Sequence, residues 1–330
     1  MPEIARILAA LAEAPSQPAA LATLVRVEGS SYRRPGARLL LRADGSRLGS
    51  ISGGCLEDDL VQRAQAVLAS FRPASATYDT TTENDLVWGL GVGCRGVVQV
   101  FVEPLAVERP RWVGVLRENL RARRATSLSV VHGGPGPLGT RLADGDSAAP
   151  EGIVFHETIA APPAVVIFGA GDDAQPVVRL AKEIGWHVTV ADSRAAYATA
   201  ERFPSADAVR AEPAAASTDA GRFDPNTFAV VMTHRYAEDR ELLRRLLPRS
   251  LGYLGVLGPR VRTDRLLAEL RADGLAPEGA GQAGLFAPVG LDLGGQTPET
   301  VALAIVAELQ SRHAGRTPIH LRERVEPIHG

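Results

Sequence analysis

From residue 164 onward the sequence alternates apolar runs with helix-forming segments, and this alternation constrains the fold more than any other feature of the chain. Strands that alternate with helices imply crossover connections, and therefore a parallel sheet with helices on both faces. We predict a Rossmann-like, doubly wound parallel-sheet domain over residues 161–330. The segments are AVVIF with AQPVVRLAKEIG, WHVTVADSR, FAVVMTHR with EDRELLRRLLP, GYLGVLG with RVRTDRLLAELRADG, and LFAPVG with TPETVALAIVAELQSRH, in which Thr297 is the expected N-cap and Pro298 the first helical residue.

Residues 1–160 show a different pattern, which is typical of an α+β domain. Helices are predicted at the start, at CLEDDLVQRAQAVLASF and at RPRWVGVLRENLRARR. Strands are predicted at ALATLVRVEG, ARLLLRADG, SRLGS, ATYDTT and VVQVFVEPL, and at three short runs between 127 and 159. The APP at 161–163 is the predicted linker, so the expected domains are 1–160 and 161–330.

The composition narrows the classes of partner. The chain is 45% hydrophobic and 22% charged, as a globular protein is, and its net charge of −2 gives no reason to expect nucleic acid or an anionic membrane. The N-terminal MPEIARILAALAEAP is an amphipathic helix rather than a signal peptide, and no apolar run reaches the roughly 18 residues of a membrane span. Cys55 and Cys94 lack a Cys/His cluster, which favours a reduced, cytoplasmic protein over a disulfide framework or zinc site.

The turn GAGDDA, which follows the first strand of the C-terminal domain, matches the dinucleotide fingerprint G-x-G-x-x-A. Gly169 allows the tight turn, Gly171 lets the backbone approach a phosphate, and Asp192 ends the next strand, where a ribose-binding acid belongs. Asp172 and Asp173 argue against this, because they would repel a phosphate unless they point away. The alternative is a Rossmann-type fold whose nucleotide site is altered or empty.

The strand FAVVMTHR is expected beside the first strand of this domain. Ligands of open α/β sheets lie at the carboxyl ends of the strands near the switch point, so Thr233, His234 and Arg235 should lie next to the glycine turn. His234 could act there as an acid or base, or it could simply cap the strand end. The histidines without such a context are His132, His156, His187, His313, His320 and His329.

The two cysteines each lie in a glycine-rich stretch. Cys55 follows Gly53 and Gly54 and precedes a predicted helix, whose N-terminus would lower the pKa of a thiol, although three acidic residues in the first turn oppose this effect. Cys94 lies in GLGVGCRG with Arg95 beside it, a setting that favours the thiolate more. The alternative is that both are small buried residues, which is the commonest fate of a free cysteine.

Several longer motifs, taken together, resemble one family. VRVEGSSYRRPGARLLLRADG, GSISGGCLEDDL and GVGCRG resemble the N-terminal domain of the XdhC/CoxI family. Its Rossmann-type C-terminal domain is similar to VVIFGAGDDAQPVVRLAKEIGWHVTVADSR, VMTHRYAEDRELLRRLL, YLGVLGPRVRTDRLLAEL and APVGLDLGGQTPETVALAIVAEL. The resemblance covers nearly the whole chain in the family's order, and SGGCLE and GLDLGGQTPETVA are its most specific stretches.

The resemblance implies a maturation factor for molybdenum hydroxylases such as xanthine dehydrogenase, aldehyde oxidoreductase and carbon monoxide dehydrogenase. Such factors bind the molybdenum cofactor, protect it, assist its sulfuration and help insert it into the apo-enzyme. Soft metal and sulfur chemistry suits thiolates, so the cysteines would stand near the molybdenum. The glycine turns would hold phosphate, and the Rossmann turn could hold the tail of a dinucleotide form rather than NAD. The residues expected to bind the cofactor are Gly53, Gly54, Cys55, Cys94, Gly169, Gly171, Asp192 and His234.

Two positions depart from the family's pattern, and two other functions stay open. Tyr236 stands where a second His is frequent and Pro259 where Ser is frequent, so the resemblance implies no role for them. An NAD(P)-dependent oxidoreductase would use Asp192 on the ribose and His234 as acid or base. A sulfur-transfer protein would carry persulfide on a cysteine. We expect an accessory protein rather than an enzyme, with an apo molybdenum hydroxylase, a cysteine desulfurase and a second copy of the chain as partners.

Overall fold

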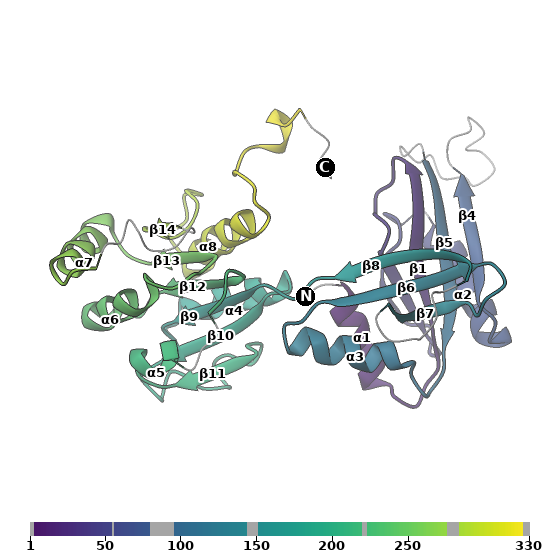
Figure 1. Cartoon of the computed structure of the whole chain (residues 1–330), viewed down its shortest axis with the longest axis horizontal. Helices are drawn as coiled ribbons and strands as arrows, with labels where there is room; N and C mark the ends of the chain where they lie inside the picture. The colour runs from purple at the N-terminus through teal and green to yellow at the C-terminus, as the bar shows by residue number, and fades with distance from the viewer. Residues whose placement is uncertain are drawn as a thin grey trace. The chain divides into compact units, whose positions relative to one another are not determined.

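The computed structural model describes residues 3–54, 56–79, 96–143, 151–219, 223–275 and 284–325. The chain divides into two compact units, Pro2–Ala161 and Pro162–Gly330, which we describe separately (Figure 1). Across the ranges just given, no helix combines the length and the apolar character that crossing a membrane requires.

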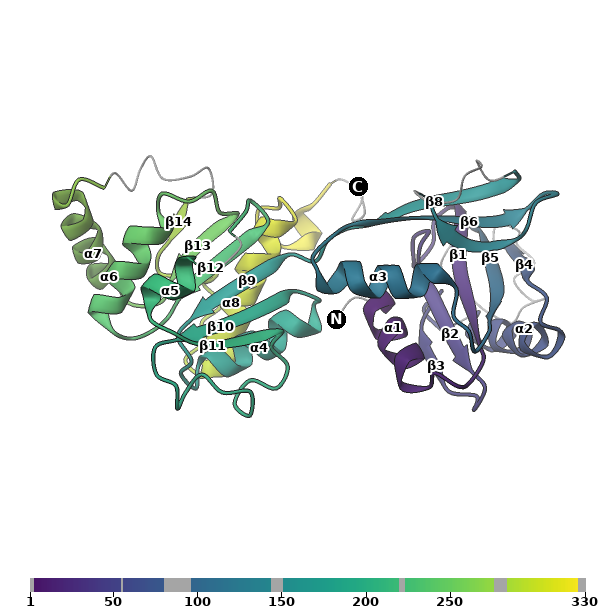
Figure 2. The ribbon, with the colours of Figure 1, turned by 60° about the horizontal axis from the view of Figure 1, so that its bottom comes forward.

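The N-terminal unit is built on an antiparallel five-stranded sheet in the order β3-β2-β1-β5-β4 (Figure 2). A smaller three-stranded sheet, β7-β6-β8, accompanies it. The strands are β1 (Ala19–Gly29), β2 (Arg38–Arg42), β3 (Arg47–Gly49), β4 (Ala74–Asp79), β5 (Gly96–Leu105), β6 (Thr126–Gly133), β7 (Gly139–Leu142) and β8 (Ile153–Ile159). The helices are α1 (Glu3–Glu13), α2 (Glu57–Ser70) and α3 (Arg111–Arg121).

The alternation of side chains along β1 explains why both faces of this sheet are covered. Successive residues of a strand point to opposite faces. Ala20 and Ala22 therefore pack with α2, whereas Leu21 packs with α1 and α3. Farther along the strand, Val25 packs with Val130 of β6. The result is the α+β domain that the sequence predicts.

The C-terminal unit is a parallel six-stranded sheet in the order β11-β10-β9-β12-β13-β14. The strands are β9 (Ala164–Phe168), β10 (His187–Asp192), β11 (Ala208–Ala211), β12 (Thr227–Val231), β13 (Tyr253–Val256) and β14 (Leu285–Phe286). The helices are α4 (Ala174–Glu183), α5 (Ala214–Asp219), α6 (Tyr236–Leu246), α7 (Arg260–Ala272) and α8 (Pro298–His313), followed by the 3₁₀ turn η3 (Leu321–Glu323).

Helices cover both faces of this sheet, so the predicted doubly wound, Rossmann-like architecture is confirmed. Ile167 of β9 packs with α4 and α8 on one face, and its neighbour Phe168 packs with α6 and α7 on the other. The chain runs outward from β9 through β10 to β11, and then returns to the other side of β9 as β12. The switch point therefore lies between β9 and β12, where such sheets bind ligands.

An Ala-rich stretch forms two elements that the sequence patterns do not predict. Residues Ala208–Ala211 form the edge strand β11, and Ala214–Asp219 form the short helix α5. The strand pairs in parallel with β10, from Ala208 beside Thr189 to Ala211 beside Asp192. Alanine has little strand propensity, so this pairing comes from the neighbouring strand rather than from local preference.

Candidate functional site

The loop that joins β3 to α2 contains the SGGC motif, and Glu57 organises it. The Glu57 side chain folds back from the first turn of the helix, and its Oε1 accepts hydrogen bonds from Ser50 Oγ (2.8 Å), Ile51 N (3.2 Å) and Ser52 N (2.8 Å). Ser52 Oγ donates to Glu57 Oε2, and it accepts from Leu56 N at 3.1 Å. Helix α2 has no side-chain cap at Leu56, and Ser52 Oγ satisfies the backbone N–H of Leu56 itself.

The acidic residues in the first turn of α2 are engaged in hydrogen bonds and ion pairs. Burial alone would raise the pKa of Glu57, but the hydrogen bonds from Ser52 and Ser50 together hold that pKa below its ordinary value. Asp59 is likewise engaged, since its Oδ2 accepts from Tyr78 Oη at 2.5 Å and from Arg63 Nε at 2.6 Å. Asp58 is exposed, and its Oδ1 lies 3.7 Å from Arg47 Nη1, so all three acids have partners.

The glycines of the motif leave the turn open on one side. Gly54 has a φ of 118°, and a Cβ there would meet nothing within 4 Å. A Cβ on Gly53 would lie 3.7 Å from Cγ of Tyr32, so the aromatic ring lies directly on this glycine. Gly53 and Gly54 therefore present backbone rather than side chains. Because Gly54 N already donates to Ser52 Oγ at 3.2 Å, the N–H of Gly53 is the one that an anion could accept from.

Cys55 and Cys94 lie outside the described residues, but the residues that flank them lie at one end of the large sheet. Gly96, two residues after Cys94, begins β5 and pairs with Gly29 at the end of β1. A Cβ on Gly96 would lie 2.4 Å from the carbonyl oxygen of Ser30. The same turn, 30–36, carries Tyr32 onto Gly53, two residues before Cys55. Gly53 and Gly96 are more than forty residues apart in the sequence, and the turn after β1 contacts both.

In the C-terminal unit the glycine turn has the geometry that the fingerprint predicts. Gly169 has a φ of 121°, and a Cβ there would lie 2.3 Å from the carbonyl oxygen of Met232, so only glycine fits between β9 and the end of β12. A Cβ on Gly171 would lie 2.6 Å from Asp173 Oδ1. The amides of Gly171, Asp172 and Asp173 donate to no atom within the ranges that the structure describes. They could therefore bind an anion.

Asp192 ends β10 as predicted, but its carboxylate is already engaged. Oδ2 accepts from Ala170 N (2.8 Å) and from Arg194 Nη2 (2.7 Å), and Oδ1 accepts from Arg194 N (2.8 Å) and Nε (2.9 Å). The side chain is 1% exposed. Burial would raise the pKa of Asp192, but these hydrogen bonds together hold it below the ordinary value. A ribose hydroxyl would have to displace one of these donors.

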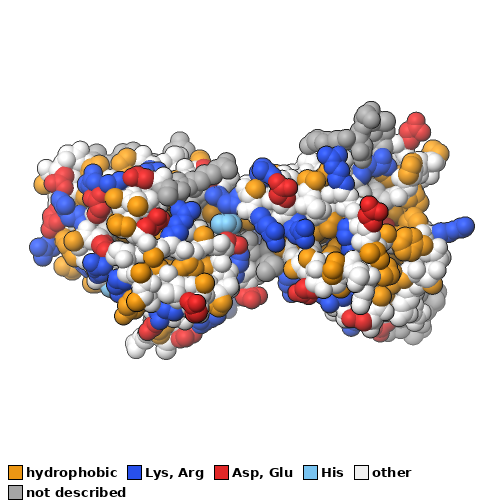
Figure 3. Space-filling view, turned by 90° about the horizontal axis from the view of Figure 1, so that it is seen from below, with side chains coloured by type: hydrophobic (Ala, Val, Ile, Leu, Met, Phe, Trp, Pro, Cys, Tyr) orange, Lys and Arg blue, Asp and Glu red, His pale blue; other side chains and the backbone are white. Residues whose placement is uncertain are grey.

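Each aspartate of the GAGDDA turn has a cationic or imidazole partner. Asp172 Oδ1 accepts from Arg202 Nη2 at 2.8 Å, and Asp173 Oδ2 lies 2.7 Å from His234 Nε2. Arg202 Nη2 also reaches the carbonyl oxygen of Ala170 at 3.3 Å. The charge of Asp172, which would repel a phosphate, is therefore offset locally by Arg202. The same mixing of charges is visible over the C-terminal unit in Figure 3, where Arg and acidic side chains are interspersed.

His234 lies beside the glycine turn, as expected from the predicted pairing of β12 with β9. Its side chain is 61% exposed and its backbone has a φ of 60°, which is uncommon for any residue other than glycine. A buried network holds the residues around it. Thr233 Oγ1 donates to Asp239 Oδ1 at 2.5 Å, and Arg262 Nη2 donates to Asp239 Oδ2 at 2.5 Å. This strained position next to a ligand-binding edge suits a functional side chain.

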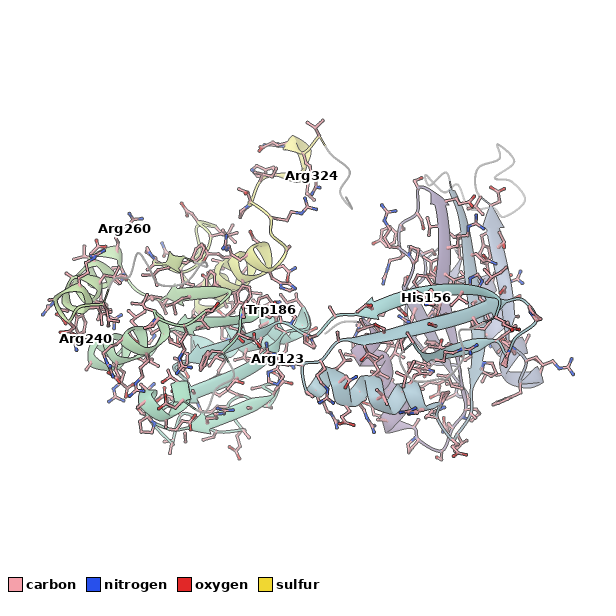
Figure 4. All side chains as sticks on the ribbon, viewed as in Figure 1. Arg123, His156, Trp186, Arg240, Arg260 and Arg324 are labelled. Atoms are coloured by element: carbon pink, nitrogen blue, oxygen red, sulfur yellow. The ribbon has the colours of Figure 1, made fainter. Side chains whose placement is uncertain are left out.

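Two of the other residues named from the sequence, His156 and Tyr236, have structural partners. Figure 4 shows His156 on β8, where its Nδ1 lies 2.9 Å from Ser129 Oγ. Tyr236, which departs from the family pattern, donates through Oη to Glu269 Oε1 at 2.9 Å, and the guanidinium of Arg265 lies over its ring. Pro259, the other departure, precedes α7 and offers no side-chain cap.

Several residues of these sites were not identified from the sequence. Arg202 binds Asp172 of the glycine turn, and Arg194 binds Asp192, whose carboxylate accepts from the turn at Ala170 N. Both guanidiniums lie over the ring of Tyr197, at 4.1 Å for Arg194 and 5.2 Å for Arg202. Arg194 could have been identified from its position two residues after Asp192, which ends a strand. Tyr32 gave no signal beyond its place in a turn, because its contact with Gly53 joins segments that are distant in sequence.

The first part of the GLDLGGQTPETVA stretch, residues 290–297, forms a largely exposed loop that is fixed at both ends, and the rest begins α8. Gly290 N donates to Glu308 Oε2 at 2.8 Å, and Tyr253 Oη donates to the same carboxylate. Burial raises the pKa of Tyr253, and the bond to Glu308 adds to this effect. At the other end Thr297 and Thr300 form a reciprocal capping box at the start of α8, so the predicted N-cap and the Pro298 after it are confirmed.

Comparison with known proteins agrees with this architecture. Residues 165–309 match the model described as the XdhC Rossmann domain, and residues 12–79 match the model described as the XdhC and CoxI family. A solved structure named as a xanthine dehydrogenase from Bacillus halodurans superposes with a TM-score of 0.79 and 31% identity, covering 96% of this chain and 97% of that one.

Two curated proteins are similar over most of the chain. A protein from Bacillus subtilis (strain 168), named as a probable subunit of xanthine dehydrogenase, is 34% identical over 312 residues, which cover 88% of this chain and 92% of that protein. The molybdenum cofactor insertion chaperone PaoD from Escherichia coli (strain K12) is 25% identical over 301 residues, which cover 89% of this chain and 83% of that protein.

Proposed function

This chain belongs to the XdhC and CoxI family, and on that premise we propose that it is a maturation factor that binds the molybdenum cofactor as cargo. It protects the cofactor, assists its sulfuration and inserts it into an apo molybdenum hydroxylase of the xanthine dehydrogenase kind. Two relatives support this proposal, since one is named as a probable xanthine dehydrogenase subunit and another as a molybdenum cofactor insertion chaperone.

The main support for the proposal is that one turn contacts residues close to both cysteines. The turn after β1 contacts Gly53 on one side and Gly96 on the other, each two residues from a cysteine. Thiolates suit the molybdenum or its sulfur, and open glycine backbone suits a phosphate. In the proposal, Cys55 and Cys94 face the metal end of the cargo, and Gly53 and Gly54 lie beside it.

The glycine turn of the C-terminal unit is proposed to bind the phosphate tail of a dinucleotide form of the cofactor. The amides of residues 171–173, which have no acceptor in the described part of the chain, support this role, as does the pairing of Asp173 with His234. The engaged carboxylate of Asp192 argues against a site built to select NAD by its ribose, because its hydrogen bonds serve the turn itself. Asp192 therefore contributes to binding by positioning Ala170 in this proposal.

A maturation assay tests the function. Wild-type protein loaded with molybdenum cofactor should activate an apo molybdenum hydroxylase, whereas the Cys55→Ser/Cys94→Ser double variant, which keeps side-chain size and removes both thiols, should not. Cysteine desulfurase added with a sulfur donor should increase the sulfurated fraction with the wild type only. Full maturation by the double variant, with its thermal unfolding unchanged, would show that the thiols have no part in the function. A persulfide found on a cysteine without any bound cofactor would instead favour a sulfur carrier.

A further inference from the structure

Tyr32 is a large side chain that the fold of the N-terminal unit does not need. It is 66% exposed, and it forms no hydrogen bond, ion pair or ring contact with any residue in the described ranges. A tyrosine in solvent gains nothing from burial. Its ring is therefore available for contact with a ligand.

The ring has one covered face and a defined place. The Cβ position of Gly53 lies 3.7 Å from ring atom Cγ and 3.8 Å from Cδ1 and Cδ2, so one face of the ring covers this glycine. An alanine Cβ at position 53 would make ordinary van der Waals contact with the ring. Next to it, Gly54 leaves open space where a side chain would be. A flat ring with one face on the backbone offers its other face to a planar ligand.

The backbone that carries Tyr32 is held firmly, which makes the ring a preformed surface. The turn begins where Gly29 pairs with Gly96, and it returns through Gly36, whose N–H donates to the carbonyl oxygen of Leu24 at 2.8 Å. Arg33 Nη2 donates to Glu3 Oε2 at 2.8 Å and ties the turn to α1. A preorganised ring loses little conformational freedom when it stacks on a ligand.

We propose that Tyr32 is the stacking platform for the fused ring system of the pterin-type cargo. This inference rests on the proposed function, and it names the residue that recognises the organic part of the cofactor beside the SGGC turn. A pterin is a planar heterocycle, and such rings stack on tyrosine as nucleobases do. Tyr32 selects for the ring, and the glycine turn beside it accommodates the rest of the molecule.

The test is an anaerobic titration with molybdenum cofactor released from a purified molybdenum hydroxylase, using the full-length protein and three variants. Tyr32→Leu removes the aromatic face and keeps an apolar side chain, and it should weaken binding about 10-fold or more, which is the range of one lost stacking contact. Tyr32→Phe keeps the ring and should bind within about 2-fold of wild type. Thermal unfolding should be unchanged in both, because the side chain is exposed.

Phe71→Leu is the matched control. Phe71 is also an exposed aromatic residue of this unit, at 50%, but it follows the far end of the 14-residue helix α2, about 20 Å along the helix from the SGGC turn. It should bind the cofactor as wild type does. Wild-type affinity of Tyr32→Leu would overturn the stacking role and leave the proposed function intact. Failure of the wild type itself to bind the cofactor would overturn both.

Discussion

At the scale of single residues, the close approach of Gly169 to Met232 and the pairing of Asp173 with His234 define the edge of the C-terminal sheet where a ligand would bind. Gly169 and His234 lie where the fingerprint and the strand order place them, because the chain direction in a parallel sheet determines which loops meet. The partners of Asp192 were not predictable, since Arg194 and Ala170 compete for its carboxylate with any ligand. The contact between Tyr32 and Gly53 was not predictable either, because no periodic pattern relates two turns.

The steric requirement at Gly169 gives a first prediction. Gly169→Ala should lower the free energy of unfolding by about 2–4 kcal/mol, because left-handed strain and overpacking each contribute about 1–3 kcal/mol. Gly274→Ala is the matched control, since Gly274 also has positive φ, at 84°, but a Cβ there meets nothing within 4 Å. Urea unfolding should show the larger loss for Gly169→Ala, and equal losses would contradict the close contact with Met232.

Asp192 gives a second prediction, because a structural anchor and a ribose ligand respond differently to substitution. If Asp192 holds the turn, Asp192→Asn should lower the free energy of unfolding by about 1–3 kcal/mol without any ligand present, since a charge-assisted hydrogen bond is lost. Arg194→Ala should have a similar effect and should not add fully to it. Unchanged unfolding of Asp192→Asn in urea would instead favour a side chain reserved for a ligand.

Glu57 gives a pH-dependent prediction. Its pKa in the folded protein lies below the ordinary value of 4.5, so its carboxylate stabilises the fold above pH 4.5. That stabilisation is lost as the pH falls below 4.5 and through the folded-state pKa. Between about pH 6 and pH 3 the wild type should therefore lose more stability than Glu57→Gln. Parallel pH profiles from thermal unfolding would contradict the hydrogen-bonded carboxylate in the SGGC turn.

At the scale of elements, most helices and strands were predictable because their signals are local. The alternation along β1 and the helical spacing in α2 depend only on which residues face the core. Caps also carry a local signal, as Thr297 and Pro298 show. The strand β11 and helix α5 were missed because alanine marks neither strand nor loop, and the strand forms through its pairing with β10.

The capping box of α8 can be tested directly. Thr297→Ala removes the acceptor for Thr300 N and should lower the free energy of unfolding by about 1 kcal/mol, the usual effect of losing an N-cap. Thr297→Ser keeps the hydroxyl and should stay within a few tenths of a kcal/mol of wild type, measured by urea unfolding. Equal losses from both substitutions would point to the threonine methyl group rather than to the cap.

At the scale of the whole molecule, the proposed function draws on one turn in each of the two units. The N-terminal unit brings the flanks of both cysteines to one turn, and the C-terminal unit holds the amides of residues 171–173 beside His234. Composition only excludes partners, whereas the ordered series of motifs across 330 residues predicts the family. The proposed cofactor and client rest on that family and on the chemistry of these two turns.

An anaerobic titration of the full-length protein with molybdenum cofactor, in its mononucleotide-free and dinucleotide forms and with NAD as competitor, distinguishes a cofactor-binding maturation factor from an oxidoreductase. We predict stoichiometric binding that NAD does not displace, with tighter binding of the dinucleotide form through the Gly169 turn. Binding of NAD with no binding of either cofactor form would contradict the proposed function and would favour an oxidoreductase that uses His234.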